Sequence, residues 1–255
     1  MLIEERQSRL QTLLAQRGIS DLESLSTELR VSQSTVRRDL DAMESHGLVR
    51  RTHGGVIWIG DRNNSKRPYA FDQRMAVQVD SKRAIARAAA KLVRDGQTIL
   101  LDGGTTTFHL AQELLGRSMQ IVTNSLPIAN LFINEERIEL ILTGGLLYPR
   151  YGVLLGPSAE QFIDSVHAQT LFFSVAGIHR GILYNQNLLL VQSEQRMMRQ
   201  AQRRVLLCDS SKFDQQALAQ LCELKQIDTL VIDGRITKEQ RAMAKQAGCE
   251  VLVAS

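Results

Sequence analysis

Short apolar segments that resemble β-strands alternate with helical segments over the larger, C-terminal part of the chain. This alternation constrains the possible folds more than any other feature of the sequence. The strand-like segments are residues 97–101, 119–122, 138–142, 170–175, 205–208, 229–232 and 250–253. The clearest helical segments between them are residues 81–93, 193–202 and 238–247. Parallel strands need crossover connections, which helices usually supply, so the pattern favours an α/β fold with a mostly parallel sheet.

The N-terminal residues show a different pattern, which indicates three short helices. Leucines recur on one face of residues 4–16, and Ser20-Asp21 can cap a second helix. Ser32 can cap a third helix that ends at Gly47, where a glycine can turn left-handed. Two short helices joined by so tight a turn are typical of a helix-turn-helix, and the third helix then has the recognition position.

The third helix is predicted to be amphipathic. Val36, Leu40 and Met43 are spaced at i, i+4 and i+7, so they form one apolar stripe. The side chains that point away from this stripe or flank it are Ser34, Arg37, Arg38, Asp41 and Ser45. Arginine can form two hydrogen bonds to guanine, and serine or threonine can reach a base or a phosphate. By themselves these residues fit a helix in the DNA major groove and an ordinary surface helix equally well.

A β-hairpin is predicted after this helix, over residues 48–58. Apolar pairs flank a basic turn that contains glycine, as in many hairpins. Arg50, Arg51 and His53 lie near its tip and could contact DNA phosphates. Such contacts position a protein on DNA and do not read its sequence.

A polar stretch without periodicity, which contains a proline, separates the hairpin from the alternating region. The chain has 255 residues, enough for two modest domains. We therefore expect a winged helix-turn-helix domain over residues 1–58, a linker over residues 59–75 and an α/β domain over residues 76–255.

Composition narrows the function classes without naming one. The net charge of +4 is only mildly basic, but residues 30–51 hold five arginines against three acids, which favours a polyanionic partner. No signal-like N-terminus or membrane-spanning apolar run is apparent, so we expect a cytoplasmic protein without a membrane partner. Three cysteines without C-x-x-C spacing and five scattered histidines predict no metal site and no cofactor. No catalytic Ser/His/Asp set can be nominated from spacing.

Small polar residues follow three of the predicted strands, at the carboxyl ends where ligands bind in folds of this class. These segments are Asp102–Thr107, Thr123–Ser125 and Thr143–Gly145. Glycines let the backbone approach a ligand, and hydroxyls at a helix N-terminus add donors where the helix dipole favours an anion. We expect residues 104–107 to hold a phosphate, while Asp102 and Asn124 bond hydroxyl groups of the same ligand.

Each of these features also has a purely structural interpretation. Gly144 and Gly145 alone are more typical of a turn, and the Gly-Thr-Thr-Thr run can simply cap a helix. Glu194 and Lys212, taken singly, are more typical of surface charges, although Lys212 could supply a cation. The run Asp102–Thr107 matches neither the dinucleotide-binding nor the Walker A pattern. Three such strand ends in succession nevertheless favour a binding site.

Characteristic motifs extend over nearly the whole chain. The N-terminal motifs are Val31-Ser32-x-x-Thr35-Val36-Arg37-Arg38-Asp39-Leu40 and Gly47-Leu48-Val49-Arg50-Arg51-Thr52-His53-Gly54-Gly55. The later motifs are Lys82-x-x-Ile85-Ala86, Asp102–Thr107, Thr123–Ser125, Gly144-Gly145, Gly156-Pro157 and Asp209-Ser210-Ser211-Lys212-Phe213. The combination of Thr-Val-Arg-Arg-Asp-Leu with His-Gly-Gly is highly specific. By these motifs the chain resembles the DeoR family of bacterial transcriptional regulators.

The resemblance implies a winged helix-turn-helix joined to a sensor domain related to ribose-5-phosphate isomerase. It also implies double-stranded operator DNA as a partner and a phosphorylated sugar as effector, which usually relieves repression. With the hairpin included, the residues expected to face DNA are Ser32, Ser34, Thr35, Arg37, Arg38, Arg50, Arg51 and His53. The residues expected to bind the effector are Asp102, Gly103, Gly104, Thr105, Thr106, Thr107, Thr123, Asn124, Ser125, Gly144, Gly145, Glu194 and Lys212.

Two segments depart from the family pattern. Many members have Ala-Asp-x-x-Phe in the central strand, whereas residues 168–172 here read Ala-Gln-Thr-Leu-Phe. The common Gly-Leu-Thr pattern is replaced by Gly-Ile-Leu at residues 181–183. Both lie near the expected pocket mouth, so the identity of the effector cannot be taken over from a relative.

The leading interpretation is a ligand-responsive repressor of a sugar-metabolism operon that acts as a homo-oligomer, a dimer or a tetramer. The alternative from another class is a sugar-phosphate isomerase with a DNA-binding appendage. That enzyme family is marked by Asp-Gly-Ala-Asp-Glu followed by Lys-Gly-Gly, but residues 175–180 here contain no carboxylate to move a proton between carbons. We therefore expect no enzyme activity. A third interpretation, an architectural DNA-binding protein with a vestigial second domain, predicts that no ligand affects DNA binding.

Overall fold

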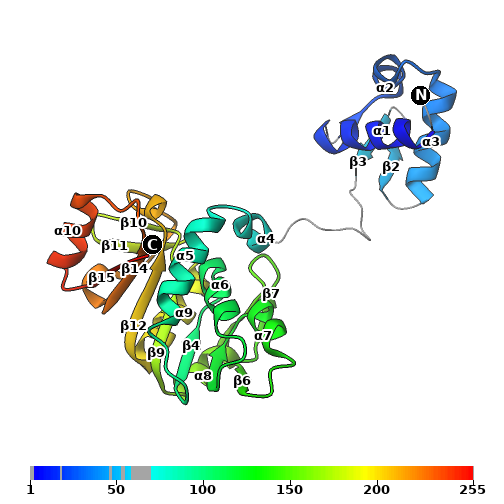
Figure 1. The fold of residues 1–255 in the computed structure, drawn as a ribbon. Coiled ribbons are helices and arrows are strands. Elements are labelled where there is room, and N and C mark those ends of the chain that lie inside the picture. Colours follow the sequence, from blue (N-terminus) through cyan, green and yellow to red (C-terminus); the bar gives the residue numbers. More distant parts are fainter. Residues whose placement is uncertain (1–2, 18, 46–47, 53–54, 59–69, 255) are drawn as a thin grey trace. The chain divides into compact units, whose positions relative to one another are not determined.

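The chain folds into two compact units, Met1–Pro68 and Tyr69–Ser255, each with its own hydrophobic core (Figure 1). The computed structural model describes residues 3–17, 19–45, 48–52, 55–58 and 70–254.

The N-terminal unit consists of three helices and a small antiparallel sheet. Its elements are α1 (Ile3–Arg17), β1 (Ile19–Ser20), α2 (Leu22–Leu29), α3 (Gln33–Ser45), β2 (Val49–Thr52) and β3 (Gly55–Trp58). Strands β2 and β3 form the predicted hairpin, with Val49 opposite Trp58, and β1 pairs with β3 as a third strand. The three helices and the hairpin confirm the predicted winged helix-turn-helix. The two-residue strand β1 is not apparent from the sequence pattern.

The apolar stripe of α3 packs into the core of this unit. Val36, Leu40 and Met43 are buried there with leucines of α1 and α2. The opposite side of α3 therefore faces outward, as its spacing predicts.

The caps of α2 and α3 explain the tight turn between them. Asp21 accepts a hydrogen bond from the Ser24 N–H at 2.8 Å and begins α2. Ser32 Oγ accepts one from the Thr35 N–H at 3.3 Å and begins α3. Between the two helices Arg30 takes a left-handed backbone with φ 53°, which reverses the chain within a few residues.

A seven-stranded parallel sheet forms the centre of the second unit. Its strands are β4 (Thr98–Leu101), β5 (Met119–Thr123), β6 (Ile138–Leu142), β9 (Ala168–Phe173), β12 (Ala201–Cys208), β14 (Thr229–Asp233) and β15 (Glu250–Ala254). Their spatial order is β15-β14-β12-β9-β4-β5-β6, and every neighbouring pair is parallel. Each strand coincides with one of the predicted apolar segments, so the expected α/β fold is confirmed.

Helices cover both faces of this sheet. One layer contains α5 (Val79–Ala90), α6 (Thr105–Glu113) and α7 (Leu126–Phe132), and the other contains α8 (Pro157–Asp164), α9 (Leu188–Gln200) and α10 (Lys238–Gln246). Successive residues of a strand point to opposite faces. Phe172 therefore packs against the first layer, whereas Leu171 and Phe173 pack against the second.

Short antiparallel elements extend the second unit beyond what the sequence pattern indicates. One hairpin joins β7 (Leu146–Tyr148) to β8 (Val153–Leu155), and a three-stranded sheet contains β10 (Gly177–His179), β11 (Ile182–Asn185) and β13 (Ala219–Glu223). A 3₁₀ turn follows β12 at Ser210–Lys212, and another lies at Leu224–Gln226. Strands this short are defined by their pairing with one another and not by an apolar pattern in the sequence.

Helix α4 (Ala70–Met75) corrects the predicted linker, which extended to residue 75. Phe71 is buried, and its ring packs edge-on against Phe108 of α6 with centroids 5.6 Å apart. This long-range contact makes α4 part of the second unit. Residues 59–69 of the predicted linker lie outside the described residues. Among the helices that are described, none combines the length and the apolar composition needed to cross a membrane.

Candidate nucleic-acid interface and ligand pocket

The outward side of α3 carries side chains expected to contact DNA. Arg37 and Arg38 are exposed, as are Ser32 and Ser34, whereas Thr35 is partly buried. The Ser32 hydroxyl lies 2.8 Å from that of Ser34 and 2.9 Å from that of Thr35, so the three form one hydroxyl cluster. Two exposed guanidiniums beside such a cluster offer the groups that base edges and phosphates bind.

A partly buried ion pair fixes α3 on α1. Arg6 Nε donates to Asp39 Oδ2 at 2.6 Å, and Arg6 Nη2 donates to Asp39 Oδ1 at 3.0 Å. The Asp39 side chain is only 5% exposed. The pair therefore orients the helix and keeps an acid away from the surface that would meet phosphates.

The hairpin is tied to the same helix. The Arg51 side chain forms an ion pair with Asp41, and its backbone N–H donates to Glu44 Oε1 at 2.9 Å. A phosphate contact by Arg51 would thus compete with an intramolecular ion pair. The backbone of Arg50 lies in β2, but its side chain and the whole of His53 lie outside the described residues.

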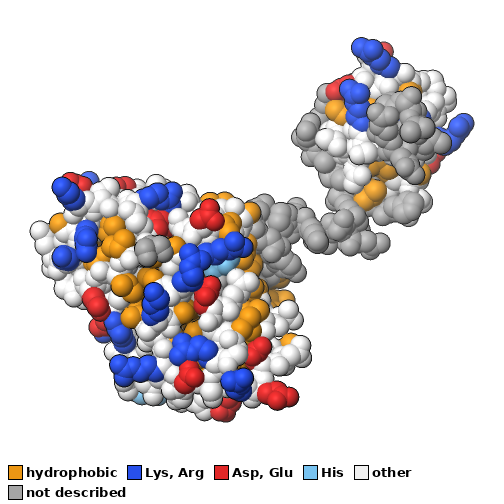
Figure 2. Space-filling model, in the orientation of Figure 1, with side chains coloured by type: hydrophobic (Ala, Val, Ile, Leu, Met, Phe, Trp, Pro, Cys, Tyr) orange, Lys and Arg blue, Asp and Glu red, His pale blue; other side chains and the backbone are white. Residues whose placement is uncertain are grey.

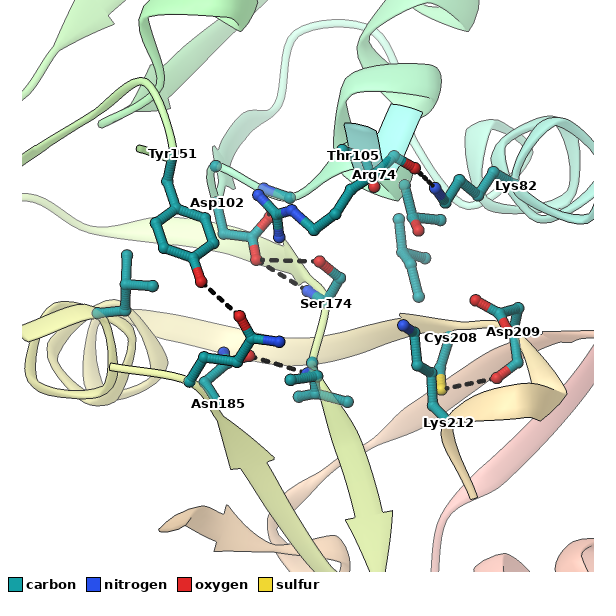
Figure 3. Close-up of a pocket in the computed structure, with 18 of the residues that line it drawn as sticks. Arg74, Lys82, Asp102, Thr105, Tyr151, Ser174, Asn185, Cys208, Asp209 and Lys212 are labelled. Carbon is teal, nitrogen blue, oxygen red and sulfur yellow. Dashed lines mark hydrogen bonds between the residues drawn. The ribbon is translucent and has the colours of Figure 1, made fainter. Parts of the chain in front are cut away.

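A cavity of about 260 Å³ lies at the carboxyl ends of the parallel strands in the second unit (Figure 3). The segments after β4, β5, β9 and β12 supply much of its wall, and residues of α4, α5 and α9 complete it. The predicted effector-binding residues that line it are Asp102, Gly103, Gly104, Thr105, Thr106, Asn124, Glu194 and Lys212.

Asp102 organises the loop after β4. Its Oδ1 accepts hydrogen bonds from the Gly104 N–H at 2.9 Å and the Thr107 hydroxyl at 2.6 Å, and its Oδ2 accepts one from the Ser174 N–H at 2.9 Å. Burial raises the pKa of Asp102, while these hydrogen bonds oppose the rise. The carboxyl group thus positions the loop in addition to lining the pocket.

The N-terminus of α6 opens into the same cavity. Gly104 precedes the helix, and a Cβ at this position would lie 2.0 Å from Ser174 Oγ, so an alanine would displace that side chain. Thr105 and Thr106 form the first turn, whose amides have no intrahelical partner and favour an anion. Nearby, Asn124 Oδ1 is buried and has no hydrogen-bond partner within the described residues, which suits a ligand hydroxyl.

Three cationic side chains reach the pocket: Arg74, Lys82 and Lys212 (Figure 3). Lys82 is only 5% exposed, and its Nζ donates to the backbone carbonyl of Arg74. Burial, and then the nearby Lys212, lower the pKa of Lys82 to about 8. The Arg74 guanidinium lies 4.5 Å from the centre of the Tyr151 ring, and burial lowers its pKa. This gathering of positive charge suits an anionic ligand.

Glu194 places a buried carboxyl group in the same pocket. Asn185 Nδ2 donates to both of its oxygens, at 2.8 and 2.7 Å, and Asn185 Oδ1 accepts from the Ala176 N–H at 2.8 Å. Burial, and then the charge of Asp102, raise the pKa of Glu194 well above its ordinary value. Residues 175–180 contain no carboxylate, but α9 brings one to this site from elsewhere in the chain.

The other predicted hydroxyl groups do not line the pocket. Thr107 supports the loop after β4, and Thr123 Oγ1 donates to the Leu101 carbonyl at 2.8 Å. Ser125 caps α7 by accepting a hydrogen bond from the Ile128 N–H at 3.4 Å. These residues build the walls of the site without reaching into it.

Gly144 and Gly145 form a turn and do not line the pocket. Both have left-handed backbones, with φ 71° and 108°. A Cβ on Gly145 would lie 2.7 Å from the Leu155 carbonyl oxygen. The small size of Gly145 thus permits the close approach of β8, whereas at Gly144 only the left-handed backbone favours glycine, because a Cβ there would meet no neighbouring atom.

Several pocket residues are not apparent from the sequence: Arg74, Gln78, Tyr151, Ser174, Asn185 and Gln186. Arg74 falls in the predicted linker, and the fold alone brings the others together. The sequence does point to Lys82, because this lysine lies on the buried face of an alanine-rich helix.

In the described parts of the chain, no group of three or more His, Cys, Asp or Glu side chains is placed to hold a metal ion. Cys208, Cys222 and Cys249 are buried free thiols. Burial raises the pKa of Cys208, so this pocket-lining thiol stays protonated at neutral pH.

Comparison with known proteins identifies both units. The model of the DeoR-like helix-turn-helix domain matches residues 6–61, and that of the DeoR C terminal sensor domain matches residues 77–234, more than half of the chain. The chain belongs to the DeoR family.

Curated relatives of this DeoR-family protein are transcription regulators. The HTH-type transcriptional regulator GlpR of Haloferax volcanii is 32% identical over 99% of this chain and 98% of its own length. The HTH-type transcriptional repressor CsqR of Escherichia coli K12 is 34% identical over 89% of this chain and 87% of its own. The L-fucose operon activator of the same strain is 32% identical over 90% and 95%. This DeoR-family chain is likewise a DNA-binding transcriptional regulator and not an enzyme.

The solved structures that match this chain are only distantly similar to it. Ribose 5-phosphate isomerase A of Methanocaldococcus jannaschii is 22% identical over 53% of this chain and 54% of its own, with a TM-score of 0.39. The eIF2B delta subunit of Chaetomium thermophilum is 16% identical over 64% and 58%, with a TM-score of 0.44. These values support no inference about activity.

Proposed function

We propose that this regulator represses a sugar-metabolism operon and that a phosphorylated sugar in the pocket of the second unit releases it from DNA. The observation that carries the proposal is the pocket itself, in which three cations and the N-terminus of α6 meet neutral and acidic hydrogen-bonding groups. The ligand acts without a metal or an organic cofactor.

A phosphate group fits the cationic part of the pocket. Lys82 and Lys212 are close enough for their charges to interact, and Thr105 and Thr106 bring the unpaired amides of α6 to the same cavity. A phosphate dianion would relieve the repulsion between the two ammonium groups and accept hydrogen bonds from the helix terminus. On the visible face of the second unit, by contrast, basic and acidic side chains are interspersed (Figure 2).

The remaining pocket residues fit the hydroxyl groups of a sugar. A hydroxyl group both donates and accepts, so it needs acceptors and donors around it. Asn124 Oδ1 and the carboxyl of Asp102 can accept, while the amide of Gln186 and the hydroxyl of Ser174 can do either. The names of relatives such as the L-fucose operon activator support a sugar-related ligand.

DNA binding is assigned to the exposed side of α3. In a homo-oligomer, two copies of α3 would enter successive major grooves about 34–36 Å apart, or a multiple of this distance. The ligand would favour an arrangement in which the two helices no longer match that spacing. Such control requires the ligand to prefer one arrangement by ~1–3 kcal/mol. The regulator acts in the cytoplasm, together with its operator.

A thermal-shift screen of the full chain against pentose and hexose phosphates tests the ligand assignment. A ligand at a hundred times its Kd adds about 2.7 kcal/mol to the stability of the unit that binds it. Lys212→Met should abolish this stabilisation, whereas Lys245→Met, at an exposed position of α10, should preserve it. The proposal fails if no sugar phosphate stabilises the wild type, or if Lys212→Met responds as the wild type does.

A further inference from the structure

The first residues of the second unit are held beside the pocket by contacts with other elements of that unit. That unit begins at Tyr69, and α4 begins at the next residue. The Phe71 ring anchors α4 on α6, as described above. After the helix, Gln78 Oε1 accepts a hydrogen bond from Arg235 Nη2 at 2.7 Å. Arg74, Val77 and Gln78 line the cavity, so the segment next to the linker is part of the pocket wall.

Arg74, in the last turn of α4, extends its guanidinium over Tyr151 (Figure 3). The tyrosine is itself held, because its hydroxyl donates to Gln186 Oε1 at 2.6 Å. Stacking uses the flat face of a guanidinium, while its N–H donors lie in the plane. Asp102 and Glu194 are near enough to act on this charge. The Arg74 side chain therefore belongs to the part of the pocket that contains the hydrogen-bonding groups.

The backbone of the same residue contacts the cationic part. Lys82 Nζ donates to the Arg74 carbonyl oxygen, and Lys212 and Asp209 act electrostatically on Lys82. Figure 3 shows Lys82, Lys212 and Asp209 on one side of the cavity and Tyr151 on the other, with the Arg74 side chain reaching towards the tyrosine. A phosphate beside Lys82 would leave the rest of the ligand beside the Arg74 guanidinium.

We propose that Arg74 binds oxygen atoms at the end of the ligand remote from the phosphate, and that α4 thereby reports occupancy of the pocket to the adjoining linker. This inference rests on the proposed function. A sugar phosphate acts on α4 in two ways. It contacts the Arg74 side chain directly, and it contacts Lys82 of α5, whose Nζ donates a hydrogen bond to the Arg74 carbonyl oxygen. Inorganic phosphate acts on α4 only through Lys82.

The contacts specify a class of ligand: a phosphate monoester with several hydroxyl or carbonyl oxygens. The Arg74 guanidinium supplies donors only, and Asn124 Oδ1 supplies an acceptor in the same cavity. A phosphate ester that lacks such oxygens, for example methyl phosphate, should bind no better than inorganic phosphate.

Two arginines beside the same ring provide a matched pair of variants. Arg74→Met removes the guanidinium from the pocket and retains a side chain of similar length. Arg150→Met is the control, because Arg150 lies 5.9 Å from the Tyr151 ring centre but is exposed and does not line the pocket.

Calorimetric titration of the full-length variants tests the contact. The probes are ribose 5-phosphate, fructose 6-phosphate, glucose 6-phosphate and inorganic phosphate. Arg74→Met should weaken the tightest of the sugar phosphates by roughly 10- to 100-fold, as expected for the loss of charge-assisted hydrogen bonds. It should leave the affinity for inorganic phosphate within about twofold, and Arg150→Met should change neither. Equal loss of both ligands, or no loss, would overturn the contact.

Hydrogen exchange and operator release test the role of α4. The sugar phosphate should slow amide exchange over residues 70–78 in the wild type and in Arg150→Met, but not in Arg74→Met at ligand concentrations that saturate the variant. The saturated Arg74→Met protein should also stay on operator DNA. Release of DNA by this variant at saturation would refute the coupling and leave the ligand assignment intact. Failure of the wild type to bind any sugar phosphate would instead refute the proposed function and this inference with it.

Discussion

Replacing Arg38 with alanine tests the assignment of α3 most sharply. Arg38 is exposed on α3, while its neighbours Asp39 and Leu40 are buried and hold the helix in place. The substitution should therefore change the stability of the N-terminal unit by no more than about 0.5 kcal/mol. If Arg38 reads a base, operator affinity should fall by ~1–3 kcal/mol. This corresponds to a rise in Kd of roughly 5- to 150-fold.

Fluorescence anisotropy at several salt concentrations provides the assay, with an operator selected from random-sequence DNA and a scrambled duplex for comparison. A base contact predicts a larger loss on the operator than on the scrambled duplex. A phosphate contact predicts equal losses and a salt slope reduced by about 1. Arg9→Ala, at an exposed position of α1, is the charge-matched control and should leave both affinities unchanged. Unchanged operator binding by Arg38→Ala would remove this residue from the interface.

Three further predictions concern the second unit. Gly145→Ala should lower the free energy of unfolding in urea by about 1–2 kcal/mol or more, because its φ of 108° disfavours a side chain. Its ligand affinity should stay unchanged, because Gly145 does not line the pocket. Phe172→Ala, at a fully buried position of the central sheet, should cost ~3–5 kcal/mol, and a cost below about 1 kcal/mol would contradict its place in the core. Because the pKa of Glu194 is raised in the folded state, its protonated carboxyl group contributes to the free energy of unfolding. This contribution is fully present below the ordinary pKa of 4.5 and is lost as the pH rises through the raised pKa. Glu194→Gln should flatten the pH dependence above pH 4.5, and an unchanged pH profile in urea unfolding would contradict the burial of an ionisable group there.

The sequence pattern was sufficient to predict the elements that depend on local periodicity. The apolar stripe through Val36, Leu40 and Met43 predicts α3 and its buried side, and the apolar segments predict every strand of the parallel sheet. The carboxyl ends of parallel strands meet at one edge of a sheet. The sequence therefore predicts that the loop beginning at Asp102 lies at the pocket, as it does.

What could not be predicted depends on contacts between distant residues. The sequence pattern places Arg74 in a linker, because the contact of Phe71 with Phe108 that makes α4 part of the second unit leaves no local signal. Gly144 resembles a ligand-binding residue in sequence, but it lies in the connection between β6 and β7 and does not line the pocket. The role of Asp102 is similarly decided by its hydrogen bonds within the loop.

The most direct test of the central claim is to follow operator occupancy while a stabilising sugar phosphate is titrated into the full-length regulator. Thermal shift in parallel samples shows at which concentration the pocket is saturated. We predict that the wild type leaves the operator over the same concentration range in which the second unit is stabilised, and that Lys212→Met stays bound throughout. Operator binding that remains unchanged in the wild type while the pocket becomes saturated would contradict the account.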